Sequence, residues 1–245
     1  MQSPEFLFSV ALGAALTSLL ATKLGFPVST THALVGGLLG AGLAGPGAEV
    51  HCGALGKSFV QPLLFRPVIA VAAGALAYGA LRACRLAPNH RTRTLDAAHY
   101  LSAGAASFAR GLNDTPKIAA LLLAVKAIDL KWGMVAVTVI IAVGALLDAD
   151  RVAETLGKKV TDMDPGQGFA ANVATAVLVI TASFHSLPVS TTHVSVGALL
   201  GIGITTRQAK WRSVGGIVLC WIVTLPCAAV LAAMTYWIGR STAGS

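Results

Sequence analysis

Charge is the scarcest property of this 245-residue sequence. Lys, Arg, Asp and Glu make up 11% of the residues, against about 25% in a typical soluble domain, whereas 55% are hydrophobic and the mean hydropathy is +0.74. A soluble fold so poor in charge could not cover its surface with polar groups, and the sequence offers no polar amphipathic helices that would cover apolar ones. The composition therefore favours a membrane-embedded protein over a large soluble enzyme.

Signals for several other classes of protein are also missing. No basic segment precedes the apolar run that starts at Phe6, and no clear cleavage site follows it, so a secretory signal peptide is not predicted. The four cysteines show no metal-ligand spacing, and Cys220 and Cys227 are expected to be packing residues in an apolar helix. The net charge of +8 gathers in polar connections, which membrane topology explains without a nucleic-acid partner.

Several apolar runs approach the length of about 20 residues that a helix needs to span a bilayer. Val214 to Ile238 is long enough, whereas Pro67 to Leu81 reaches spanning length only if the flanking Arg66 snorkels to the interface. The shorter runs, whose polar flanks can sit at the interface, are Phe6 to Ala21, Trp132 to Leu147 and Phe169 to Phe184. We therefore expect an all-α, polytopic bundle of transmembrane helices in the cell membrane.

One polar sequence, Pro-Val-Ser-Thr-Thr-His, occurs twice in the chain. It opens the blocks 27–42 and 188–203, in which twelve of 16 positions are identical at an offset of 161 residues. Each copy follows an apolar run, and each carries a proline that stops one helix before a Gly-spaced apolar helix begins. The duplication predicts two related halves with broken or re-entrant helices at these sequences, as in secondary transporters.

The repeated sequence is suited to binding an oxyanion. A helix N-terminus offers free N–H groups at the positive end of the helix dipole, and Ser29 and Ser190 are placed to cap such helices. Neighbouring hydroxyl groups would add neutral donors. The candidate substrate-binding residues in the two turns are Ser29, Thr30, Thr31, Ser190, Thr191 and Thr192.

The alternative for these turns is a pair of ordinary helix starts, with capping serines and packed threonines. Two copies in an apolar chain favour the binding site. His32 and His193 could be ligands, but a histidine after a capping turn also secures local hydrogen bonds, so they are assigned a structural or supporting role.

Residues 99–125 carry ionisable side chains within an apolar, small-residue stretch. Such groups are costly at membrane depth and usually face a cavity or a partner. Asp114 is the only carboxylate in this stretch, so it is the candidate for binding a coupling cation. Lys117 lies one helical turn away and could pair with Asp114 or meet the substrate anion. Arg110 and Asn113 complete the polar set.

Two residues of this stretch are expected to disturb a helix. Gly111 and Pro116 would interrupt regular hydrogen bonding and free carbonyl groups for a cation. The alternative is a loop between two short spans, because Asn-Asp-Thr-Pro also fits a turn and its charges would then lie in water.

Together these motifs resemble the inorganic phosphate transporter (PiT) family. The resemblance rests on Gly111-Leu112-Asn113-Asp114 with Lys117, which is similar to the family's G-x-N-D signature, on the two P-x-S-x-x-H copies, and on residues 155–173. It covers almost the whole chain. It implies two inverted repeats and cation-coupled symport of inorganic phosphate, with substrate and ions between the G-x-N-D helices and the two turns.

Carried over to this chain, the resemblance assigns roles to the polar residues. Asn113 and Asp114 would bind the coupling cation, which is sodium or a proton, while the two turns and Lys117 would bind phosphate. No cofactor or metal is expected beyond a possible sodium ion. Residues 1–84 would be the remainder of the first repeat, 85–98 a basic connecting loop and 99–245 the second repeat.

The sequence also departs from the family pattern. The family has a G-x-N-D signature in each half, whereas this chain has one, and too few residues precede Phe6 to hold another. We expect the sequence to be partial, to need a missing N-terminal half or a homo-oligomeric partner, or to have lost transport.

Three further hypotheses remain open. A sulfate permease would fit the same donors, but only phosphate can donate a hydrogen bond, so an acceptor facing the anion would favour phosphate. A hydrolase is disfavoured because Ser and His share one short turn without a strained nucleophile elbow, so the chain is predicted not to be an enzyme. The fixed charge of Lys117 could replace a mobile cation near the anion.

Overall fold

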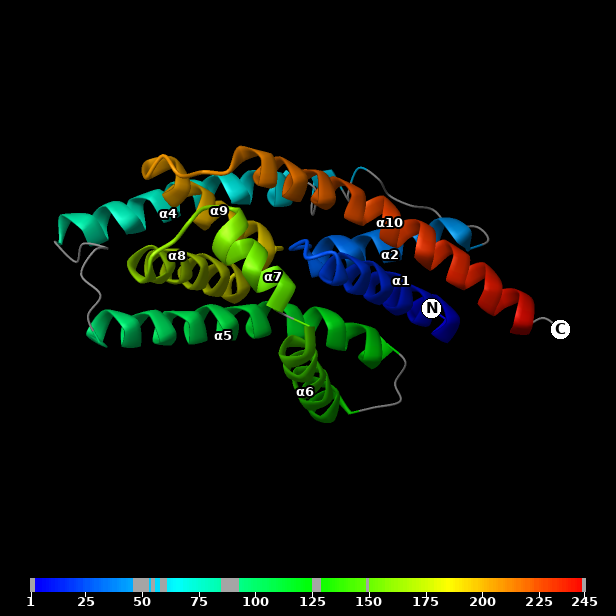
Figure 1. The fold of residues 1–245 in the computed structure, drawn as a ribbon. Helices are drawn as coiled ribbons and strands as arrows, with labels where there is room; N and C mark the ends of the chain where they lie inside the picture. The colour runs from blue at the N-terminus through cyan, green and yellow to red at the C-terminus, as the bar shows by residue number, and fades with distance from the viewer. Residues whose placement is uncertain are drawn as a thin grey trace. The chain divides into compact units, whose positions relative to one another are not determined.

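The computed structural model describes residues 3–45, 53, 56–57, 61–84, 93–124, 129–148 and 150–243. All of the regular secondary structure within these ranges is helical, which confirms the predicted all-α class (Figure 1). The helices are α1 (Pro4–Lys23), α2 (Thr30–Ala44), α4 (Gln61–Ala83), α5 (Arg93–Ala124), α6 (Leu130–Asp148), α7 (Asp150–Glu154), α8 (Pro165–Phe184), α9 (Thr191–Thr205) and α10 (Trp211–Ala243), with a π-helical turn at Thr155–Lys159.

Contacts divide the chain into two compact units, each assembled from separate segments. Unit 1 consists of Met1–Gly53, Asp114–Val152 and Ile217–Ser245, and unit 2 of Ala54–Asn113 and Ala153–Gly216. The chain passes from one unit to the other within α5, within α7 and within α10. The units do not follow the predicted repeat boundaries, so the division into 1–84, 85–98 and 99–245 stays a prediction.

Among the described residues, four helices are long and apolar enough to cross a membrane by length and composition. These are α1, α6, α8 and the Trp211–Ser241 part of α10, and they cover four of the predicted apolar runs. The fifth run, Pro67 to Leu81, lies in α4, which is not among the four. α2 and α9 have 15 residues each, about 22 Å of helix, which is short of the roughly 30 Å hydrocarbon core. Their length fits the predicted broken or re-entrant helices.

The helix breaks before α2 and α9 have the same backbone geometry. α1 and α8 are both 20 residues long, begin with proline and are offset by 161 residues. After each, one residue takes a left-handed conformation: Gly25 with φ 76° and Ser186 with φ 52°. The equivalent closing hydrogen bonds, each 2.9 Å, run from Phe26 N to Ala21 O and from Leu187 N to Ala182 O. The local match supports two related halves, while their inversion stays a prediction.

Glycines allow two helices to pack closely in each unit. In unit 1, a Cβ atom on Gly40 of α2 would overlap the backbone of Ala229 in α10. In unit 2, a Cβ atom on Gly201 of α9, which is 161 residues further along, would overlap the backbone of Val71 in α4. Small residues at such positions allow the close backbone approach by which membrane helices pack.

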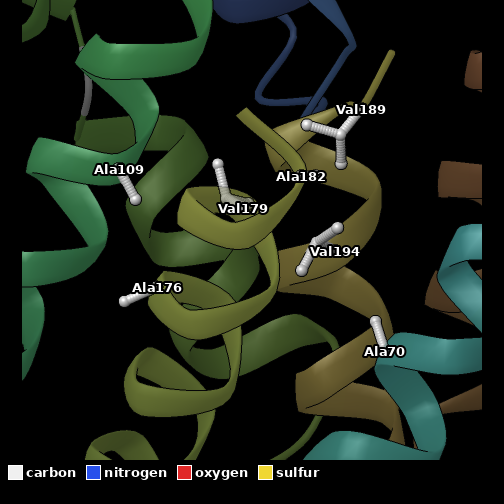
Figure 2. Packing of buried hydrophobic residues seen from close by; sticks show 7 residues of the cluster. All are labelled: Ala70, Ala109, Ala176, Val179, Ala182, Val189 and Val194. Atoms are coloured by element: carbon white, nitrogen blue, oxygen red, sulfur yellow. The ribbon is translucent and has the colours of Figure 1, made fainter. Parts of the chain in front are cut away.

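The core of unit 2 is made of small apolar side chains from several helices (Figure 2). α4 and α5 each contribute an alanine, α8 contributes three residues, and the chain before and within α9 contributes two valines. The cluster comprises Ala70, Ala109, Ala176, Val179, Ala182, Val189 and Val194. Because Val189 immediately precedes the turn at Ser190, this packing fixes where α9 begins.

The charged stretch forms one helix, α5, rather than a loop between two spans. α5 has 32 residues and continues through Gly111 and Pro116, so the loop alternative is wrong, while the release of carbonyl groups at these two residues stays a prediction. Residues 93–98 of the predicted connecting loop are the first turns of α5, and residues 85–92 lie outside the described ranges, as does Val125. The continuous helix puts its polar side chains in fixed register.

Candidate functional site

Each repeated turn begins a serine-capped helix, as predicted. Ser29 Oγ accepts a hydrogen bond from the backbone N–H of His32 at 3.2 Å, and Ser190 Oγ accepts one from the backbone N–H of His193 at 3.2 Å. Both serines are buried. Neither helix has an acidic residue in its first turn, so the positive end of each helix dipole is not neutralised by its own side chains.

The threonines that follow the caps are mostly removed from solvent. Thr31, Thr191 and Thr192 are 3–4% exposed, and Thr30 is partly buried. A buried hydroxyl group without a hydrogen-bond partner would be unfavourable, so the partners of these groups decide what the turns can bind.

In unit 1, α5 supplies an ammonium group to the turn before α2. Lys117 Nζ donates to Thr31 Oγ1 at 3.0 Å, and it also lies 3.6 Å from Asp114 Oδ1. The Lys117 side chain is 25% exposed and the Asp114 side chain 7% exposed. The predicted pairing of Lys117 with Asp114 is thus present, and the hydroxyl, the ammonium and the carboxylate form one local cluster.

In unit 2, α5 supplies a guanidinium group to the turn before α9. Arg110 Nη2 donates to Thr192 Oγ1 at 3.1 Å, and Arg110 Nε donates to Thr191 Oγ1 at 3.4 Å. Asn113 Nδ2 donates to the carbonyl oxygen of Val189 at 3.2 Å, which ties the residue before the serine cap to α5.

Arg110 is the residue that the site assignment from sequence omitted. Its position relative to the other three polar residues was a usable signal, because Arg110, Asn113, Asp114 and Lys117 follow the spacing i, i+3, i+4, i+7. That spacing places side chains along one face of a helix. The stretch was interpreted as a helix and Arg110 was named in its polar set, but its threonine partners could not be identified from the spacing.

The two histidines take part in the capping turns through their backbone. His193 is 4% exposed and His32 is partly buried, and each backbone N–H satisfies its capping serine. A supporting role for the imidazole rings stays a prediction, as do the substrate and cation roles of the other site residues. Across the described parts of the chain, no group of three or more His, Cys, Asp or Glu side chains could hold a metal ion.

The fold and the turns together define a multi-pass helical membrane protein in which two capped helix N-termini are presented beside cationic side chains. The chain belongs to the phosphate transporter family, whose sequence model matches residues 3–232. Members of this family are transporters, so the prediction that the chain is not an enzyme is confirmed, and so is its multi-pass membrane class.

Individual relatives are similar along nearly the whole chain. A probable low-affinity inorganic phosphate transporter of Rhizobium meliloti (strain 1021) is 31% identical over 96% of this chain and 74% of its own length. A protein of the same description from Mycobacterium leprae (strain TN) is 31% identical over 96% of this chain and 60% of its own length. The chain therefore spans about 60% of the length of its mycobacterial relatives.

A solved structure described as the sodium-dependent phosphate transporter has the same fold. It matches with a TM-score of 0.78 at 23% identity, covering 97% of this chain and 81% of that one. At this identity the match bears on the fold alone.

Proposed function

We propose that this chain takes part in cation-coupled symport of inorganic phosphate, and that each unit carries an oxyanion-binding turn, at the N-terminus of α2 in unit 1 and at that of α9 in unit 2. One observation carries the proposal. In each unit, a cationic side chain of α5 donates to a buried threonine hydroxyl in the first turn of a serine-capped helix, namely Lys117 to Thr31 and Arg110 to Thr191 and Thr192. Family membership and the relatives' names support phosphate as the substrate.

The direction of these hydrogen bonds suits an anion. A threonine hydroxyl group that accepts from an ammonium or guanidinium group lies beside a positive charge, which would also attract an oxyanion. The cation also polarises that hydroxyl, which strengthens the hydrogen bond it can give to an oxyanion. Each turn thus combines hydroxyl donors, a nearby cation and the positive end of a helix dipole.

The carboxylate in unit 1 favours phosphate over sulfate. Asp114 lies beside Lys117, which itself contacts the turn at Thr31, so an acceptor belongs to the same cluster as the donors. Hydrogen phosphate can donate to such an acceptor, whereas sulfate has no proton to donate and would meet like-charge repulsion. We propose that Asp114 and Asn113 bind the coupling cation.

The proposal is tested with radiolabelled phosphate uptake into proteoliposomes that contain only this chain, with unlabelled sulfate as competitor. Gradient-driven uptake that resists excess sulfate is the expected result. Uptake abolished by equimolar sulfate would identify a sulfate permease instead. If correctly inserted protein gave no uptake, phosphate transport by this chain alone would be rejected in favour of a transporter part that needs a partner.

A further inference from the structure

α5 brings a fixed positive charge to the same hydroxyl position in both repeated turns. Thr31 and Thr192 are equivalent residues at the offset of 161, and their Oγ1 atoms accept from Lys117 Nζ at 3.0 Å and from Arg110 Nη2 at 3.1 Å. The lysine and the arginine are seven residues apart, which is two turns of one helix. Two unlike side chains therefore perform the same contact, each within its own unit.

These contacts place a positive charge against oxygen atoms of the kind that ligate a sodium ion. Hard monovalent and divalent cations are held by several oxygen ligands, such as hydroxyl, carboxylate and carbonyl groups. At the turn in unit 1, the Thr31 hydroxyl oxygen and the Asp114 carboxylate both face the Lys117 ammonium. A sodium ion on either oxygen would lie within a few ångströms of that charge and would be repelled by it.

The turn in unit 2 is equally unsuited to sodium. The oxygens of Thr191 and Thr192 accept from the guanidinium group of Arg110, so a positively charged group already lies against them. Asn113 presents its amide nitrogen to the Val189 carbonyl oxygen, so this hydrogen bond also engages an oxygen at the start of the turn. What a mobile cation would supply at this turn, positive charge beside the anion, is already supplied by the chain.

We infer that Lys117 and Arg110 are tethered cations that stand where sodium would otherwise be needed, so that phosphate movement through this chain requires no sodium. This inference rests on the proposed function. Of the two coupling ions considered, sodium and a proton, it favours the proton. It also assigns to Arg110 the same role as to Lys117, a fixed positive charge beside the anion.

The first test is phosphate counterflow, which needs no ion gradient. Proteoliposomes containing the chain are preloaded with unlabelled phosphate, and entry of labelled phosphate is measured in sodium buffer and in choline buffer. Equal exchange in both buffers is expected. Exchange seen only with sodium would overturn the inference while leaving phosphate transport intact. No exchange in either buffer would reject the proposed function, and the inference with it.

The second test removes the tethered charges. Arg110→Gln and Lys117→Gln are expected to lower exchange in choline at least about tenfold, the usual effect of losing a hydrogen bond to a charged group. Sodium should then restore part of the exchange, because the threonine oxygens are released to hold it. Arg110→Lys and Lys117→Arg should retain most of the wild-type exchange in choline.

Arg93→Gln is the matched control, since Arg93 is an exposed cation at the start of the same helix. It should change neither the rate nor the response to sodium. Exchange by Arg110→Gln and Lys117→Gln that equalled the wild-type rate in choline would overturn the inference. If a Gln variant failed to insert, the charge-conserving variant at that position would decide: sodium-dependent exchange by it would also overturn the inference.

Discussion

The two units use one backbone plan with different charges at its centre. In both, a 20-residue helix, a left-handed turn residue, a serine cap and a 15-residue helix follow in the same order, and glycines bring the short helix onto a neighbour. Beside the turn, unit 1 has an ammonium and a carboxylate, whereas unit 2 has a guanidinium and a carboxamide. The two turns therefore share their sequence and backbone, and they differ in the α5 side chains that contact them.

That difference separates two tasks that a transporter must perform. The turn in unit 2 contacts the guanidinium group of Arg110 and the neutral amide of Asn113. The turn in unit 1, in contrast, contacts Lys117, which is paired with the carboxylate of Asp114. We therefore expect loss of the Asp114 carboxylate, which has no counterpart among the contacts described for the turn in unit 2, to alter coupling, whereas variants of Lys117 and Arg110 should behave alike.

The largest effect is expected from removing the carboxylate of unit 1. Asp114→Asn should lower gradient-driven phosphate uptake at least about tenfold while the protein still inserts. Lys117 loses its charged partner, and the carboxylate proposed to bind the coupling cation is removed. Uptake is measured in proteoliposomes at matched protein content. Asp162→Asn is the control, since Asp162 forms an exposed pair with Lys210 that should contribute little. Normal uptake by Asp114→Asn would remove this residue from the ion site.

The next effect concerns the scaffold and should be equal in the two units. Gly40→Ala and Gly201→Ala each place a methyl group against the backbone of a neighbouring helix, which should destabilise the fold by about 1–3 kcal/mol. Thermal unfolding in detergent micelles measures the change. Gly79→Ala is the control, because a Cβ atom there meets nothing within 4 Å. A large loss of stability for only one of the two variants would show that the two glycine contacts do not contribute equally to stability.

The duplicated turn was predictable because local sequence determines it. Ser29 and Ser190 were recognised as N-caps since a serine before a helical run satisfies backbone N–H groups whatever surrounds it. The apolar runs likewise predicted α1, α6, α8 and α10 because a spanning helix depends mainly on length and hydropathy.

Predictions that depended on tertiary context were less successful. Gly111 and Pro116 disfavour a helix locally, yet α5 continues through both, since packing of a long helix overrides local propensity. Arg110 was not assigned to the site because its partners, Thr191 and Thr192, lie about 80 residues away and nothing local announces them. Likewise, no sequence pattern indicated that contact units would cut across the repeats.

A smaller effect is expected at the caps, and it should differ in kind from the charge variants. Ser29→Ala and Ser190→Ala each remove one hydrogen bond to a backbone N–H, which typically costs about 1 kcal/mol of stability. Ser→Gly at the same positions should cost only a few tenths of a kcal/mol. Thermal unfolding compares the four variants. Unchanged stability in all four variants would mean that the serine hydroxyl groups do not stabilise the fold as caps.

The smallest effect concerns the left-handed residue of each helix break, which is a glycine in unit 1 and a serine in unit 2. Ser186 holds a left-handed conformation that costs an ordinary residue about 1 kcal/mol or more, while its equivalent is Gly25. Ser186→Gly should relieve that strain, but glycine also loses more backbone entropy on folding, so the net gain is about 0.5 kcal/mol. Gly25→Ser should lose a similar amount or more, because Gly25 is buried whereas Ser186 is exposed. Thermal unfolding of both variants and of the double exchange measures this. If the double exchange matched the wild type in stability, glycine and serine would be interchangeable in backbone energy at the two breaks, whereas a loss would show that the surroundings of each break decide which residue fits.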